Sequence, residues 1–196
     1  MNRISAMALD EIAASIKRRN SRRKPVLIAI EGFGGAGKTT FAEKLNGALG
    51  DAYIINMDDF LLKESLINDV SPEKTGFDRA RLKRQVLVPA TVGQTVRYQK
   101  FIWASNSLSE PVTVPAITYL IVEGSSSYHP SIAKYYDYKV WVDSPIELAK
   151  RRGHARDGSS ENAQHWDLWA ANDLRYQTKY HPEQHADFVL DNSTAI

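Results

Sequence analysis

The stretch VLIAIEGFGGAGKTT, residues 26–40, carries the strongest structural signal in this sequence. Its first five residues form a continuous apolar run rich in β-branched side chains, which is typical of a parallel strand buried on both faces. Residues 32–39 satisfy the pattern G-x-x-x-x-G-K-[ST]. Residues 38–49 then place apolar side chains on one helical face, and Gly50 ends the predicted helix. A strand, a glycine-rich loop and a helix in this order predict a phosphate-binding loop, or P-loop.

The chemistry of such a loop is that of an anion site. Glycines let the backbone curl so that successive N–H groups point inward, and the helix N-terminus adds the positive end of its dipole. Lys38 is expected to supply a point charge to the β- and γ-phosphates, and the Thr39 hydroxyl to ligate Mg²⁺. ATP and Mg²⁺ are therefore the predicted cofactors. The predicted nucleotide-binding residues are Gly32, Gly34, Gly35, Ala36, Gly37, Lys38, Thr39 and Thr40.

The rest of the chain alternates between strand and helix patterns. Four further apolar runs are predicted as strands, and two segments with helical periodicity lie between them. A three-layer α/β/α P-loop NTPase fold with a mostly parallel five-stranded sheet follows, with ligands at the carboxyl ends of the strands. The additional predicted strands are 53–57, 119–122, 139–142 and 188–190, and the predicted helices are 145–152 and 162–179.

Two segments stand apart from this alternation. Residues 1–24 are predicted as a basic amphipathic helix, and residues 25–196 as one domain. Within that domain, residues 60–118 contain four prolines and one predicted helix, Asp78–Val88. We expect this segment to be an insertion that forms an acceptor pocket or lid over the strand ends.

Two acidic residues follow predicted strands. Asp58 comes directly after the second strand, where a carboxylate would face the phosphates and accept a proton from an attacking hydroxyl. Glu123 ends the apolar run 119–122, a position from which a carboxylate can hold Mg²⁺ beside a P-loop. Asp58 could instead be a solvated loop acid or cap a helix, and Glu123 could face solvent at the strand end.

A basic stretch, residues 150–156, ends the helix predicted after the fourth strand. Arg151 and Arg156 are the candidates to close over a triphosphate and offset charge during transfer. A solvated basic helix end is the alternative. Aromatic and acidic residues of the insertion are candidates for acceptor binding together with Asp58. These candidates are Phe60, Phe77, Asp78 and Tyr98.

Composition narrows the function further. The chain has 196 residues, no cysteine, and a net charge of +2, of which residues 1–24 contribute +5 and the remainder −3. Absence of cysteine excludes disulfides and thiolate chemistry, and the weak net charge argues against nucleic acid as the main partner. No apolar run could span a membrane, so a cytoplasmic protein without a membrane partner is expected. A homo-oligomer stays open.

Several pieces of the sequence together resemble the uridine kinase-like P-loop small-molecule kinases, which are related to nicotinamide riboside, pantothenate and phosphoribulose kinases. These pieces are GFGGAGKTTFAEKL (32–45), MDDF (57–60), GFDRARL (76–82), VRYQKFIW (96–103), YLIVEG (119–124) and RRGHARD (151–157). The resemblance implies that Asp58 acts on the acceptor hydroxyl and that Arg151 and Arg156 contact phosphates. Leu61 and Ile102 depart from the uridine kinase pattern, which has Tyr and Asp there.

We therefore predict an ATP-dependent phosphotransferase that acts on a hydroxyl of a small-molecule acceptor, a nucleoside such as uridine. Two alternatives stay open. One is a kinase for another alcohol, such as pantothenate, a sugar or nicotinamide riboside. The other is a P-loop nucleotide-binding regulatory protein whose basic N-terminal segment docks a partner.

Overall fold

A computed structural model describes residues 8–18, 24–62, 76–157 and 165–193 of the chain. At its centre is a sheet of five strands in the order β2-β7-β1-β8-β9, and all four neighbouring pairs are parallel. The predicted five-stranded α/β sheet is thereby confirmed. The strands are β1 (Val26–Glu31), β2 (Ala52–Asn56), β7 (Tyr119–Glu123), β8 (Tyr138–Asp143) and β9 (Phe188–Asp191).

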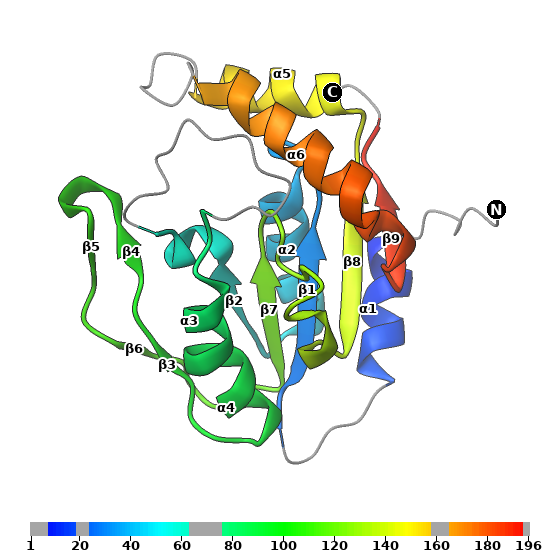
Figure 1. Ribbon diagram of the computed structural model, residues 1–196. Helices are drawn as coiled ribbons and strands as arrows, with labels where there is room; N and C mark the ends of the chain where they lie inside the picture. The colour runs from blue at the N-terminus through cyan, green and yellow to red at the C-terminus, as the bar shows by residue number, and fades with distance from the viewer. Residues whose placement is uncertain (1–7, 19–23, 63–75, 158–164, 194–196) are drawn as a thin grey trace.

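Helices flank the sheet and cross its carboxyl edge (Figure 1). Helix α2 (Lys38–Leu49) packs on β1, β2 and β7, and α1 (Leu9–Lys17) packs on α2. Helices α5 (Ile146–Asp157) and α6 (Trp166–Tyr180) pack against each other above the strand ends. Short helical turns lie at η4 (Ala133–Tyr135) and η6 (Pro182–Gln184).

The core explains why these elements form. Every residue of β1 and of β7 is buried, which accounts for their uninterrupted apolar sequences. Ile12 and Ile16 of α1 are fully buried in the same core. The N-terminal helix is thus packed on the main fold. The predicted boundary between an N-terminal segment, residues 1–24, and a domain, residues 25–196, stays a prediction. Within the described ranges, no helix is long and apolar enough to cross a membrane.

The segment between β2 and β7 is built from short elements. The helical stretch predicted over Asp78–Val88 instead covers residues 79–91, with a π-helical middle just before Pro89. Because proline has no N–H to donate, a wider turn at this point lets the helical path continue. The elements are η1 (Met57–Phe60), α3 (Arg79–Leu82), η2 (Lys83–Leu87), α4 (Val88–Thr91), β3 (Arg97–Tyr98), β4 (Phe101–Ile102), η3 (Trp103–Ser105), β5 (Ser107–Leu108) and β6 (Val112–Thr113).

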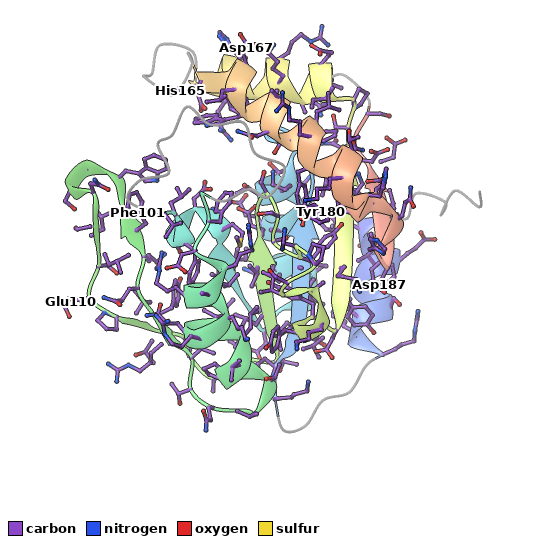
Figure 2. The ribbon with its side chains drawn as sticks, in the orientation of Figure 1. Phe101, Glu110, His165, Asp167, Tyr180 and Asp187 are labelled. Carbon is purple, nitrogen blue, oxygen red and sulfur yellow. The ribbon has the colours of Figure 1, made fainter. Side chains whose placement is uncertain are left out.

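The short strands form two antiparallel pairs, β3 with β6 and β4 with β5. Both pairs lie beside the β2 edge and outside the main sheet, as the labelled Phe101 and Glu110 show (Figure 2). The structure therefore has a continuous sheet that carries the strand ends and a separate group of small elements at one side.

Candidate active site

The loop from Gly32 to Thr39 joins β1 to α2, as the motif predicts. Gly35 and Gly37 have φ angles of +80° and +97°, which side chains rarely tolerate. A Cβ atom at Gly35 would also overlap the carbonyl oxygen of Ala149 in α5. The loop thus needs glycine both for its curl and for its close contact with α5.

The groups expected of a phosphate site lie around Lys38. Its side chain is 9% exposed and Nζ donates to the backbone oxygen of Phe33 at 2.9 Å. Thr39, the next residue, donates from Oγ1 to Oε1 of Glu123 at 3.0 Å. Since Glu123 ends β7, beside β1 in the sheet, the parallel register brings these residues to one edge.

Asp58 reaches the same edge from β2. The Asn56 side-chain oxygen accepts the Asp58 backbone N–H at 3.2 Å and caps the N-terminus of the short turn η1. This cap holds Asp58 in the first part of that turn. Solvent reaches Asp58, but the protein around it displaces enough water to raise the pKa of its carboxyl. Asp59 adds to this rise, whereas the charges of Lys38 and Arg156 oppose it.

The Glu123 carboxyl responds to a similar set of neighbours. Burial raises its pKa, and the charge of Lys38 and the hydrogen bond from Thr39 lower it. A hydroxyl and a carboxylate 3.0 Å apart are hard oxygen donors of the kind Mg²⁺ prefers. The residues predicted to hold the metal, Thr39 and Glu123, therefore fit a bound Mg²⁺.

The arginines of α5 face different ways. Arg156 lies close enough to influence Asp58 and pairs with Asp157, Nε to Oδ1 at 2.8 Å. Arg152 donates to the backbone oxygen of Asn192 at 3.0 Å. Arg151 instead lines a shallow surface hollow with Glu147, Lys150, His154 and Ala155.

Helical geometry explains this split. Ala149 and Gly153 touch the P-loop, so neighbours on that side, at 152 and 156, turn toward it as well. Sequence reasoning missed Arg152 because it did not establish which helical face meets the loop. The phosphate roles predicted for Arg151 and Arg156 stay predictions. Of the two, Arg156 is the one whose charge acts on Asp58, whereas Arg151 lies in the surface hollow.

No known protein-family profile matches the chain. Among solved structures, one from Bacillus stearothermophilus named as a provisional uridine kinase has a TM-score of 0.72 and 16% identity over 93% of this chain and 97% of that one. A Silicibacter protein, named as a provisional fructose transport system kinase, has a TM-score of 0.66 and 20% identity over 94% and 99%. The D-glycerate 3-kinase of Cryptococcus neoformans has a TM-score of 0.53 and 11% identity over 86% and 85%.

The chain has the fold of these kinases. At such identities the likeness concerns the P-loop kinase fold, and the functional residues must be argued from the site itself. Within this fold, β1, β2 and β7 deliver Lys38, Asp58 and Glu123 to one edge, as the sequence predicted.

Two of the predicted acceptor residues lie inside the insertion. Phe60 and Tyr98 are fully buried and stack on each other with ring centroids 5.7 Å apart. They lie within the interior of the insertion, where they pack on each other. Their predicted role in acceptor binding stays a prediction.

The other two acceptor candidates are partly exposed. Asp78 caps α3, with Oδ1 accepting the Arg81 backbone N–H at 2.9 Å, and its other oxygen lies 3.4 Å from Arg81 Nε. Phe77 is half-buried and forms an isolated antiparallel bridge with Leu61. Both residues are thus held by the insertion at the level of η1, which contains Asp58.

Two functional candidates were not predicted at all. Asn192, directly after β9, donates from Nδ2 to the Ala36 backbone oxygen at 2.7 Å. Asp173 of α6 accepts the Gly34 backbone N–H at 2.6 Å. A polar residue at a strand end is the same signal that marked Asp58, so Asn192 could have been found, whereas nothing in the local sequence marks Asp173.

Proposed function

We propose that this chain is an ATP- and Mg²⁺-dependent kinase that phosphorylates a hydroxyl group of a small molecule. The observation that carries the proposal is the convergence of Asp58, Lys38 and the Thr39–Glu123 pair at the P-loop edge of the sheet. A phosphate-binding loop alone would suit many nucleotide-binding proteins. A carboxylate at Asp58, placed among these charges, is what phosphoryl transfer to an alcohol requires.

On the donor side, the loop amides and Lys38 hold the phosphates of ATP. Gly32, Gly34, Gly35, Ala36, Gly37 and Thr40 belong to the same nucleotide-binding assignment. Arg156, and Arg151 by the sequence prediction, offset negative charge on the transferred group. Thr39 and Glu123 would hold Mg²⁺, which when bound neutralises charge on the β- and γ-phosphate oxygens.

On the acceptor side, Asp58 orients the attacking hydroxyl and accepts its proton. The acceptor oxygen forms a bond to the γ-phosphorus while the bond to the bridging oxygen breaks, so ADP leaves and Asp58 holds the proton. The raised pKa of Asp58 makes it a better proton acceptor than an ordinary exposed carboxylate. Its contribution depends on position as much as on basicity.

We propose a nucleoside-like acceptor such as uridine, with pantothenate, a sugar or nicotinamide riboside as alternatives. Support comes from the motif resemblance and from a structural neighbour named for uridine. Against strict nucleoside selectivity, Ile102 stands on β4 and is 40% exposed, so it offers an apolar surface where related sequences have a carboxylate.

The deciding experiment incubates the purified protein with Mg²⁺-ATP and a panel of these alcohols, and detects the phosphorylated product by mass. We expect one acceptor class to gain a phosphate with the wild type and none with Asp58→Asn. Slow ATP hydrolysis that no acceptor stimulates would contradict the kinase and favour the regulatory alternative.

A further inference from the structure

Asp173 connects helix α6 to the P-loop although the two lie 139 positions apart in sequence. The side chain is 6% exposed, and Oδ2 accepts the Gly34 backbone N–H at 2.6 Å. Its second oxygen, Oδ1, accepts the Ser125 hydroxyl at 3.4 Å. Ser125 follows Glu123 by two residues, so one carboxylate holds both the P-loop and the loop that leaves β7.

The P-loop is also braced on its other side. Asn192 donates to the Ala36 backbone oxygen, and the Ala36 N–H closes a turn onto the Phe33 oxygen at 3.0 Å. Asp173 and Asn192 therefore hold the beginning and the middle of the loop from outside, through α6 and the end of β9. The loop conformation does not depend on its own residues alone.

Trp166 makes the same helix fit closely around the loop. A Cβ atom at Gly34 would lie 3.1 Å from the Trp166 ring, and one at Gly153 of α5 would overlap it. The indole N–H also donates to Oδ2 of Asp157 at 3.1 Å. Helix α6 thus contacts the P-loop and α5 together, and Asp173 is its hydrogen-bonded contact with the loop.

We propose that Asp173 is a positioning residue that keeps the P-loop in its nucleotide-binding conformation. The proposal rests on the proposed function in that ATP is the ligand. A loop already held in the bound shape loses less conformational freedom when phosphate binds, which strengthens binding. The feature on which the proposal depends is an oxygen acceptor for the Gly34 N–H.

Two substitutions separate these features. Asp173→Ala removes the acceptor and leaves the partly buried Gly34 N–H without its partner. Asp173→Asn keeps an oxygen for Gly34 and places an amide N–H₂ toward Ser125 Oγ, which can accept it. Asp167→Ala is the matched control, because it changes the same residue type in the first turn of α6, where the side chain is 85% exposed and pairs with Lys150 (Figure 2).

The experiment measures binding of Mg²⁺-ATP by calorimetry, with no acceptor added, together with thermal unfolding of each variant. We expect Asp173→Ala to bind ATP about tenfold more weakly, as loss of one hydrogen bond with its donor left unpaired would predict. Asp173→Asn and Asp167→Ala should stay within about twofold of wild type. Wild-type ATP affinity in Asp173→Ala, or ATP binding by Asp173→Asn as weak as that of Asp173→Ala, would overturn the proposal.

A second measurement keeps the test valid if the alanine variant does not fold. Amide exchange of Gly34 in the ATP-free wild type, followed by NMR with labelled glycine, should be slow because the N–H is already bonded. Fast exchange would overturn the inference. If no protein in the series binds ATP, the proposed function fails instead, and the two failures are thereby distinct.

Discussion

Two regions of the molecule are each stabilised by a different kind of interaction. One is the carboxyl edge of the sheet that carries Lys38, Asp58 and Glu123, here called the donor edge, and the other is the insertion between β2 and β7. At the donor edge, parallel strands pair in register and place Asn56 beside Glu123, so the backbone ladder positions the functional ends. In the insertion, contacts made by the guanidinium of Arg81 position much of the backbone. It is 3% exposed, donates to the backbone oxygens of Gln99, Asp59 and Leu61, and lies 4.7 Å above the Phe60 ring.

This difference has a consequence for specificity. A backbone ladder constrains many residues at once and tolerates few changes, whereas contacts made by side chains can be altered one residue at a time. If the proposed function holds, the group-transfer residues stand on the part of the fold that strand pairing positions, and the acceptor residues stand on the part that side chains position.

The largest effect is expected where the donor edge loses its central charge. Lys38→Ala should lower turnover by about a thousandfold or more, because the phosphates lose their buried cation. The measurement is acceptor-dependent ADP formation, with circular dichroism to check the fold. Lys44→Ala, an exposed lysine on the outer side of α2, is the control and should retain activity. Near-normal turnover in Lys38→Ala would remove Lys38 from the mechanism.

The next largest effect is expected at Asp58, where the donor edge meets the insertion. Asp58→Asn should lower kcat by about a thousandfold while ATP binding stays within a few-fold, since the amide cannot accept the proton. The matched change is Asp59→Asn, whose carboxylate instead contacts Lys100 Nζ at 3.3 Å and Tyr98 OH at 3.4 Å. A smaller loss, mainly in KM for the acceptor, is expected there. Equal losses in both would contradict the assignment of the base.

The pH profile provides an independent check on Asp58. Only the deprotonated carboxylate can take the proton, and burial raises its pKa. The value of kcat/KM should therefore fall as pH decreases through this raised pKa, at a higher pH than an ordinary Asp would give. The Asp58→Asn variant should lack this acid limb. A wild-type profile without such a limb would mean that another group controls the proton.

A change inside the insertion should spare the donor edge. Arg81→Ala leaves partly buried carbonyl oxygens without donors and is expected to destabilise the fold by about 2–3 kcal/mol. If the insertion is the weaker region, ATP affinity should change little below the melting temperature while KM for the acceptor rises. The comparison fails if ATP binding is lost as strongly as acceptor binding, because both regions would then depend on Arg81.

The donor edge could be predicted from sequence because its information is local. An apolar run gives a strand, and the polar residue after it must lie at the carboxyl edge, which was enough to bring Lys38, Asp58 and Glu123 together. The aromatic residues of the insertion carry no such rule. From sequence, Phe60 and Tyr98 could line a pocket or form a core, and the stacking that the structure shows between them is a tertiary contact.

The contacts that α6 makes with the P-loop and α5 could not be predicted from the sequence either. Trp166 of α6 lies on Gly34 and Gly153, and Tyr180 packs against His129. Helical spacing groups these rings on one face but does not say what covers that face. For the same reason Asp173 could not be recognised, since its partner is a backbone N–H far away in sequence.

The smallest effect concerns the two arginines predicted to contact phosphate. Arg156→Ala should lower kcat by about tenfold, because a cation near Asp58 and Glu123 is lost where charge develops. Arg151→Ala should stay within about twofold, since that side chain lies in the outer hollow of α5 with Lys150 and His154. Steady-state kinetics at saturating ATP measures both. A tenfold loss in Arg151→Ala would mean that α5 rotates when ATP binds, which its close fit between Gly35 and Trp166 opposes.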